Sequence, residues 1–186
     1  MFKKDLSAGA RSKVKSSVHR TLRAKFLETY PGFEPYIDEI IPKKAPMELV
    51  KLPDRVSLYL VGSQPIFFQT LDSPLIPHLR IVHAFPSALP TIGIDRGAIR
   101  FVLAGAALMA PGLTSAGGQL PDPATNPEDT EIEAGNVVAI LAEGKEEACL
   151  VGELKMGTED IKKKGKGVVM DEGHYLGDGL WNLSFD

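Results

Sequence analysis

The hydrophobic pattern of the first ninety residues predicts a small domain of helices and strands. From Ser12 onward, apolar residues recur at every fourth position, which is typical of an amphipathic helix. The stripe consists of Val14, Val18, Leu22, Phe26 and Tyr30. Ser12 is the expected N-cap, and Pro31-Gly32 is the expected stop. A second short helix is expected over 34–41 and a third over 77–85.

Between these helices the apolar residues alternate with polar ones, which indicates β-strands. We expect strands over 47–52, 56–61 and 66–69, with Pro53-Asp54 as the turn between the first two. Residues 1–89 therefore read as an N-terminal α+β domain. Pro86 and Pro90 bracket a short connector, so this domain is expected to pack against the C-terminal half of the chain.

The pattern changes after Pro90, and residues 90–186 are predicted to form a second domain. A short strand over 91–94 leads to Asp95, a favourable N-cap, and to a helix over 97–103 that ends at Gly105. Further strands are expected over 137–142, 148–154, 168–170 and 180–185, with a helix over 157–163. Several short strands with glycine-rich corners predict a small closed β-barrel, so the fold class of the chain is α+β.

An acidic stretch interrupts the second domain at about 119–135, and we interpret it as a loop insertion. Residues 121–135 contain five acidic and no basic side chains, and Ile132 is the only large apolar residue among them. Such a segment buries too little apolar surface to offset its ordering entropy. We expect a mobile surface loop that points away from any RNA.

The charge is distributed unevenly along the chain. The net charge is −3, yet residues 1–30 contain eight Lys or Arg and only two acids. A basic end on an acidic body suggests a directed surface for RNA or a protein partner. The candidate residues are Lys13, Lys15, Arg20 and Arg23. A plain solvated helix face explains the same charges, and both interpretations stay open.

Composition argues against several classes of protein. The single cysteine, Cys149, and four scattered histidines give no metal-ligand spacing. No nucleophile–base pattern, phosphate-binding loop or dinucleotide fingerprint is present, and no apolar run approaches the ~18 residues of a membrane span. We therefore expect no catalytic residue, no metal, no cofactor and no membrane insertion.

The segment 95–113 resembles the signature of the PUA domain, in which a short helix ends in a glycine and a Pro-Gly pair opens the next strand. Gly105 and Ala106 lack bulk, so a nucleic-acid backbone could approach them, and free backbone N–H groups there could hold phosphate oxygens. PUA domains often add a Lys-Gly turn, which matches Lys164-Gly165-Lys166. The resulting RNA-binding candidates are Arg100, Gly105, Ala106, Ala107, Met109, Pro111, Gly112, Lys164 and Lys166.

Motifs along the whole chain resemble one eukaryotic family, the translation machinery-associated and malignant T-cell-amplified sequence proteins, in its fungal form. They are Met1-Phe2-Lys3-Lys4, Ile41-Pro42-Lys43-Lys44, Phe67-Phe68-Gln69, Leu113-Thr114-Ser115, the stretch 156–161 and the stretch 174–181. The resemblance implies a heterodimer with density-regulated protein that acts on the small ribosomal subunit. It further implies contact with ribosomal RNA near the tRNA acceptor end, and roles in tRNA release, subunit recycling and reinitiation. Because no apolar signal-peptide core or membrane span is found, we expect a cytoplasmic protein.

The sequence departs from the family pattern at two places. Ala104-Gly105-Ala106-Ala107 stands where related proteins usually have Ser-Gly-Ala-Asn, and Ala110 replaces a usual cysteine. Side-chain hydrogen bonds to RNA are thereby removed, and backbone contacts are expected to remain.

Two other functions are compatible with parts of this pattern. PUA domains also occur in RNA-modification and ribosome-biogenesis proteins, but a catalytic domain needs far more than the ~90 residues before Thr91. A protein-interaction scaffold without direct RNA binding stays open.

Overall fold

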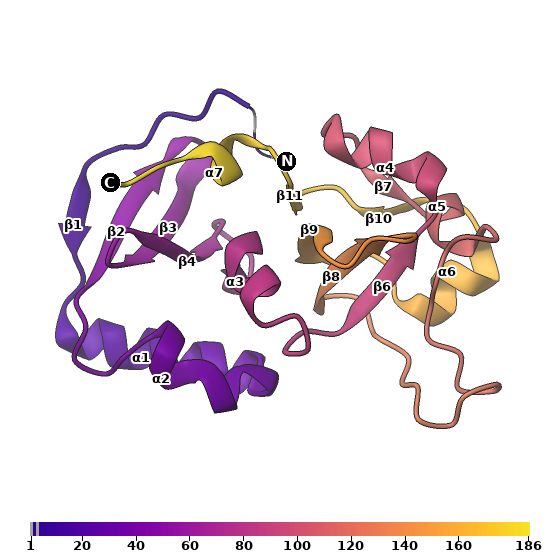
Figure 1. Ribbon diagram of the computed structural model, residues 1–186, viewed down its shortest axis with the longest axis horizontal. Coiled ribbons are helices and arrows are strands. Elements are labelled where there is room, and N and C mark those ends of the chain that lie inside the picture. The colour runs from indigo at the N-terminus through magenta and orange to yellow at the C-terminus, as the bar shows by residue number, and fades with distance from the viewer. Residues whose placement is uncertain (1, 3) are drawn as a thin grey trace.

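The computed structural model describes residues 2 and 4–186, so Met1 and Lys3 of the opening motif lie outside the described residues. Two parts of the chain lie side by side along the longest axis, and the C-terminal segment with α7 (Gly179–Asn182) returns from the second part to the first (Figure 1). Both contain helices and strands, and the predicted α+β class is confirmed.

The first part is built on a five-stranded antiparallel sheet. Its order is β1-β2-β3-β4-β5, with strands Arg11–Lys13, Met47–Leu52, Val56–Val61, Gln64–Gln69 and Ile76–Pro77. In β3 every second residue is buried, as the alternating pattern predicts. Helix α1 (Ser16–Thr29) covers the sheet, and the ring of its Phe26 stacks on Phe67 of β4 with centroids 5.3 Å apart. Short helical elements complete this part: 3₁₀ turns at Pro31–Tyr36 and Pro53–Arg55, and helices α2 (Ile37–Ile40) and α3 (Leu79–Ala84).

The predicted start of the first helix at Ser12 is wrong. Ser12 lies in β1, where it pairs with Leu49 of β2, and the helix begins four residues later. The reason is a non-local one, since the edge of β2 supplies backbone partners to residues that would otherwise extend the helix. The predicted stripe is also wrong at Val18, which is 44% exposed while His19 is buried. An α-helix has 3.6 residues per turn, so positions spaced strictly by four drift around its surface.

The second part contains two sheets around one hydrophobic core. The larger has the order β11-β9-β8-β6, from strands His174–Tyr175, Ala148–Glu153, Val137–Ala142 and Thr91–Ile94, and β6 is parallel to β8. The smaller pairs β10 (Val168–Met170) with β7 (Leu108–Met109). Helices α4 (Arg96–Leu103), α5 (Pro111–Thr114) and α6 (Thr158–Lys164) connect the strands. Helix α7 (Gly179–Asn182) follows the last strand and lies beside β2 and β3 of the first part (Figure 1). Both sheets contribute to the core, as Ile140 and Val169 illustrate.

Two predicted strands of this part are helical instead. Residues 179–182 form α7, because the carboxylate of Asp178 caps it by accepting a hydrogen bond from the Trp181 N–H at 2.8 Å. Pro111-Gly112 opens α5 rather than a strand, and the strand of this region, β7, precedes the pair. Proline at the first helical position has no N–H to leave unsatisfied.

The acidic segment forms no regular helix or strand between 115 and 135, as expected, but it does have fixed partners. Gln119 exchanges two backbone hydrogen bonds of 2.8 Å with Gly93 of β6. Ile132 makes two more of 2.8 Å with Thr158 of α6, accepting from its backbone N–H and donating to its hydroxyl oxygen, and packs against the core. Lys162 also contacts Glu131 and the Pro121 carbonyl. The expectation of a segment without stable packing is therefore wrong at both of its ends.

The two parts pack together through a shared hydrophobic cluster, as the short connector predicts. Val151, Leu180 and Phe185 from the second half join the core of the first. The buried rings of His78 and His174 meet at this junction with centroids 4.5 Å apart. These two histidines are structural and not solvated.

Candidate nucleic-acid and partner interface

Residues of α4, β7 and α5 line a groove of about 610 Å³. These elements lie at the top of the second part in Figure 1. It brings together six of the nine predicted RNA-binding residues: Arg100, Ala106, Ala107, Met109, Pro111 and Gly112. The remaining three, Gly105, Lys164 and Lys166, do not line it.

Local sequence features position the groove. The Asp95 carboxylate caps α4 by accepting a hydrogen bond from the Ala98 N–H at 2.8 Å. Gly105, with φ of +86°, then reverses the chain into β7. Gly112 allows α5 to approach α4, since a Cβ at this position would lie 3.0 Å from the Cβ of Ala98. These contacts fix both walls of the groove.

The basic turn after α6 lies beside this groove. Met109 of β7 pairs with Val168 of β10, and the Ala110 N–H donates to the Gly167 carbonyl at 2.9 Å. Lys166 therefore lies next to Gly167 at the groove's edge. Lys162 and Lys163 are ion-paired with Glu131 and Glu159, whereas no ion pair within the described residues engages Lys164 or Lys166. These two ammonium groups are exposed and available to an anionic ligand.

An exposed apolar patch surrounds the mouth of the groove. Phe101 is 53%, Met109 44% and Val168 39% exposed, and they are three of the five large apolar side chains exposed in the part of the chain the structure describes. Exposed apolar residues that cluster in this way mark interaction surfaces. Phe101 and Val168 were missed at the sequence level. The signal was present for Phe101, because the buried stripe of α4 passes through Val102 and leaves Phe101 outside it.

The expected phosphate-binding role of two backbone N–H groups is wrong. The Gly105 N–H donates to the Val102 carbonyl and the Ala106 N–H to the Phe101 carbonyl, both at 3.0 Å. These bonds close the C-terminus of α4 and occupy both donors. The open space expected at Gly105 is also filled, since a Cβ there would lie 3.1 Å from the hydroxyl oxygen of Tyr175. The glycine serves internal packing.

Asp95 adds a negative charge to the lining of the groove. Hydrogen bonds from the Ser115 hydroxyl and the Ala98 N–H lower the pKa of this carboxyl. It is ionised at neutral pH and disfavours phosphate beside it. Arg100 of the same helix is the basic residue of the groove lining, and its guanidinium carbon lies 4.8 Å from the centroid of the Phe101 ring.

Replacing Gly105 by alanine is expected to destabilise the fold by about 1–3 kcal/mol, because alanine is strained at this positive φ and also meets Tyr175. Gly177 is a matched control, since its φ is +84° and no described atom lies within 4 Å of its would-be Cβ. The free energy of unfolding in urea is measured for Gly105→Ala and Gly177→Ala. Both variants have backbone strain from a positive φ, and only Gly105→Ala adds a close contact with Tyr175. An equal loss of stability in the two variants would contradict the packing role assigned to Gly105.

The second predicted surface lies at the opposite end of the molecule, around β1 and α1 (Figure 1). Lys13, Lys15 and Arg20 are exposed there. Arg23 is instead tied to the protein, since its Nε donates to the Ile41 carbonyl at 3.0 Å and its Nη2 contacts Asp38 at 2.5 Å. The structure thus presents three of the four basic residues to solvent and does not bring them near the groove.

The described residues contain no group of three or more His, Cys, Asp and Glu side chains arranged to hold a metal ion. None of the helices that the structure describes is both long and apolar enough to cross a membrane.

Comparisons with known proteins identify both domains. Residues 2–86 match the Pre-PUA-like domain and residues 90–176 match the PUA domain. Translation machinery-associated protein 20 of Saccharomyces cerevisiae is 52% identical over 188 residues, covering 100% of both chains. The chain belongs to the translation machinery-associated protein 20 family. Malignant T-cell-amplified sequence 1 of Rattus norvegicus is 41% identical over 170 residues, which cover 91% of this chain and 88% of the rat protein.

Solved structures share the fold of this chain. A hypothetical protein of Pyrococcus horikoshii superimposes with a TM-score of 0.70 at 19% identity, covering 92% of this chain and 98% of the archaeal one. A PUA-domain protein of Aeropyrum pernix gives a TM-score of 0.68 at 23% identity, with 95% and 90% covered. The predicted PUA-type barrel and the predicted fungal-type family membership are confirmed. Family and domain together give the chain a translation-related, RNA-binding role.

Proposed function

We propose that the chain is a non-enzymatic, cytoplasmic translation factor that forms a heterodimer with density-regulated protein on the small ribosomal subunit. There it contacts ribosomal RNA near the tRNA acceptor end and supports tRNA release, subunit recycling and reinitiation. The observation that carries this proposal is the groove beside α4 and β7. An exposed apolar patch there adjoins two lysines that no described carboxylate neutralises through an ion pair.

The proposed interface has two chemically distinct parts. Arg100, Lys164 and Lys166 supply positive charge for phosphates, and the small residues Ala106, Ala107 and Gly112, with Pro111, let an RNA backbone come close. Phe101, Met109 and Val168 offer apolar area that phosphates cannot use, and that a protein partner can bury. Met109 is therefore assigned to the partner, although the sequence pattern placed it among the RNA contacts.

Sedimentation with purified small subunits tests this proposal. The chain is expected to co-sediment more strongly when density-regulated protein is present. Nuclease treatment is expected to remove the part of its association that RNA contacts provide. Association that depends on the partner but resists nuclease and salt would favour the scaffold without direct RNA binding.

The basic surface at α1 is a second candidate for RNA contact. If it faces RNA, changing Lys13, Lys15 and Arg20 together to glutamine flattens the dependence of log affinity on log salt by about 0.7–0.9 for each phosphate that the chain no longer touches. Arg23 is not changed because its guanidinium already donates hydrogen bonds to Asp38 and to the Ile41 carbonyl. An unchanged slope would assign this face to solvent or to the protein partner.

A further inference from the structure

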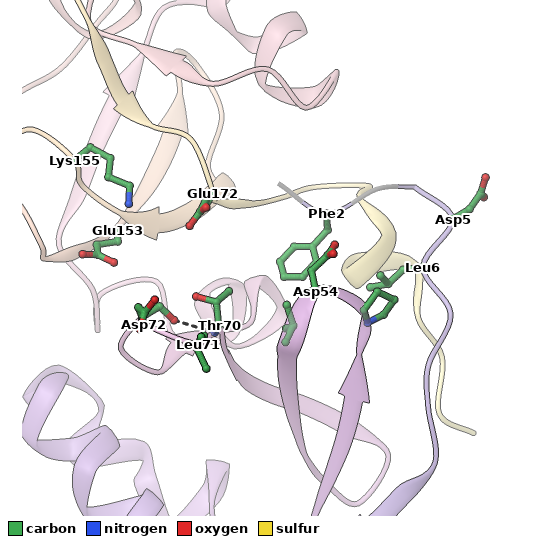
Figure 2. Close-up of a pocket in the computed structure, with 13 residues that line it drawn as sticks. Phe2, Asp5, Leu6, Asp54, Thr70, Leu71, Asp72, Glu153, Lys155 and Glu172 are labelled. Carbon is green, nitrogen blue, oxygen red and sulfur yellow. Dashed lines mark hydrogen bonds between the residues drawn. The ribbon is translucent and has the colours of Figure 1, made fainter.

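A cleft of about 760 Å³ lies at the surface between the two parts of the molecule, and residues of both parts line it (Figure 2). The proposed function does not use this face. One wall carries Glu153, Lys155 and Glu172 of the PUA domain, and the facing wall carries Asp54 and the turn over 70–73 of the N-terminal domain. The N-terminal segment closes one end with Phe2, Asp5 and Leu6. Of the residues described, none lines both this cleft and the α4–β7 groove.

The cleft concentrates the negative charge of the protein. Its lining contains five carboxylates, Asp5, Asp54, Asp72, Glu153 and Glu172, against the single ammonium group of Lys155. The lining charge is thus −4, whereas the whole chain carries −3. The Lys155 ammonium also lies 3.9 Å from Asp171, so it is shared with a carboxylate outside the lining.

The distribution of these carboxylates favours an elongated ligand. Glu153 and Glu172 lie on one wall and Asp54 and Asp72 on the facing wall, while the Asp5 side chain points away from them at the outer end (Figure 2). No three of the described acidic side chains gather into a metal-binding group. A single divalent cation is therefore a poor match. An elongated ligand with several cationic groups could form an ion pair with a carboxylate at each of them.

The exposed apolar side chain of Leu71 in the cleft lining restricts the kinds of cationic ligand that fit. Leu71 projects from the turn over 70–73 with 66% of its surface exposed, the largest fraction among the exposed large apolar residues of the described chain. Leu6 and Phe2 are half-buried nearby. A polyamine would leave this apolar surface unused, and an RNA backbone would be repelled by the carboxylates.

We infer that the cleft between the domains binds an extended, lysine- and arginine-rich protein segment that carries an apolar side chain for contact with Leu71. Basic side chains of the segment reach the carboxylates on the two walls. Because such pairs are largely exposed, binding is weak, steered by charge and sensitive to salt.

A fluorescently labelled peptide of lysines and arginines with one central leucine tests this inference on the full chain at low salt. Changing Asp72 to asparagine together with Glu172 to glutamine is expected to weaken peptide binding about three- to tenfold, since exposed ion pairs are individually weak. The matched control changes Glu128 and Glu146 to glutamine, which alters the net charge equally on exposed residues outside the cleft. The control is expected to bind within about twofold of the unaltered chain.

The apolar contact is tested separately with Leu71→Ser. This variant is expected to weaken binding of the leucine-containing peptide and to leave unchanged the binding of a peptide with serine in its place. Equal weakening by the cleft and control variants, or no saturable binding by the unaltered chain, would overturn the inference.

Discussion

Replacing Asp178 by alanine is expected to destabilise the folded chain by about 3–5 kcal/mol, the range found when one partner of a buried polar network is removed. The Asp178 side chain is fully buried at the junction of the two halves. Its Oδ2 contacts Nδ1 of His174 at 2.8 Å and accepts a hydrogen bond from the Tyr175 N–H at 3.0 Å, while Oδ1 accepts from the Trp181 N–H. Alanine would leave all three groups without this partner.

Urea unfolding measures the effect, and Asp178→Asn is the matched variant. Asparagine preserves the shape and one acceptor oxygen, so its loss of stability should be smaller than that of alanine. A change below about 1 kcal/mol for Asp178→Ala would show that water or relaxation satisfies these groups, and that the junction is less dependent on Asp178 than its burial indicates.

Changing Met109 to aspartate is expected to weaken binding of density-regulated protein by about 2–4 kcal/mol, or roughly 30- to 1000-fold. The new carboxylate would be desolvated against Phe101 and Val168 when the partner covers the apolar patch. Isothermal titration with the purified partner measures the change.

Val18→Asp is the control for this experiment, since Val18 has the same 44% exposure and lies on α1 at the other end of the molecule. It should bind the partner as the unaltered chain does. Equal affinities for the two variants would show that the partner does not cover the groove. Strong weakening by Val18→Asp alone would move the partner to α1.

Elements whose partners are close in sequence were predictable from the chain alone. The strand over 56–61 follows from strict alternation, because its neighbours in the sheet are joined to it by short turns. The strand over 91–94 and the cap at Asp95 follow from local signals in the same way. Elements that depend on distant contacts were not predictable. Ser12 forms a strand only because Leu49 pairs with it, and the acidic segment is held by Thr158 of α6.

The candidate site was predictable in position but not in detail. The PUA-like signature located most of the groove lining, because a helix, a glycine turn and a Pro-Gly pair are local features. The Gly105 and Ala106 N–H groups donate to carbonyls at the end of α4. This hydrogen bonding depends on the geometry of the helix end, which residue types alone do not determine. Val168 joins the patch through pairing with Met109 from nearly sixty residues away, and no local pattern indicates this contact.

Ultraviolet crosslinking of the heterodimer bound to small ribosomal subunits, with the crosslinked residues mapped by mass spectrometry, tests the central claim most directly. The account predicts crosslinks to ribosomal RNA in the segments that carry Arg100 and Lys164 to Lys166. Crosslinks absent from both segments but present elsewhere on the chain would contradict the proposed RNA face.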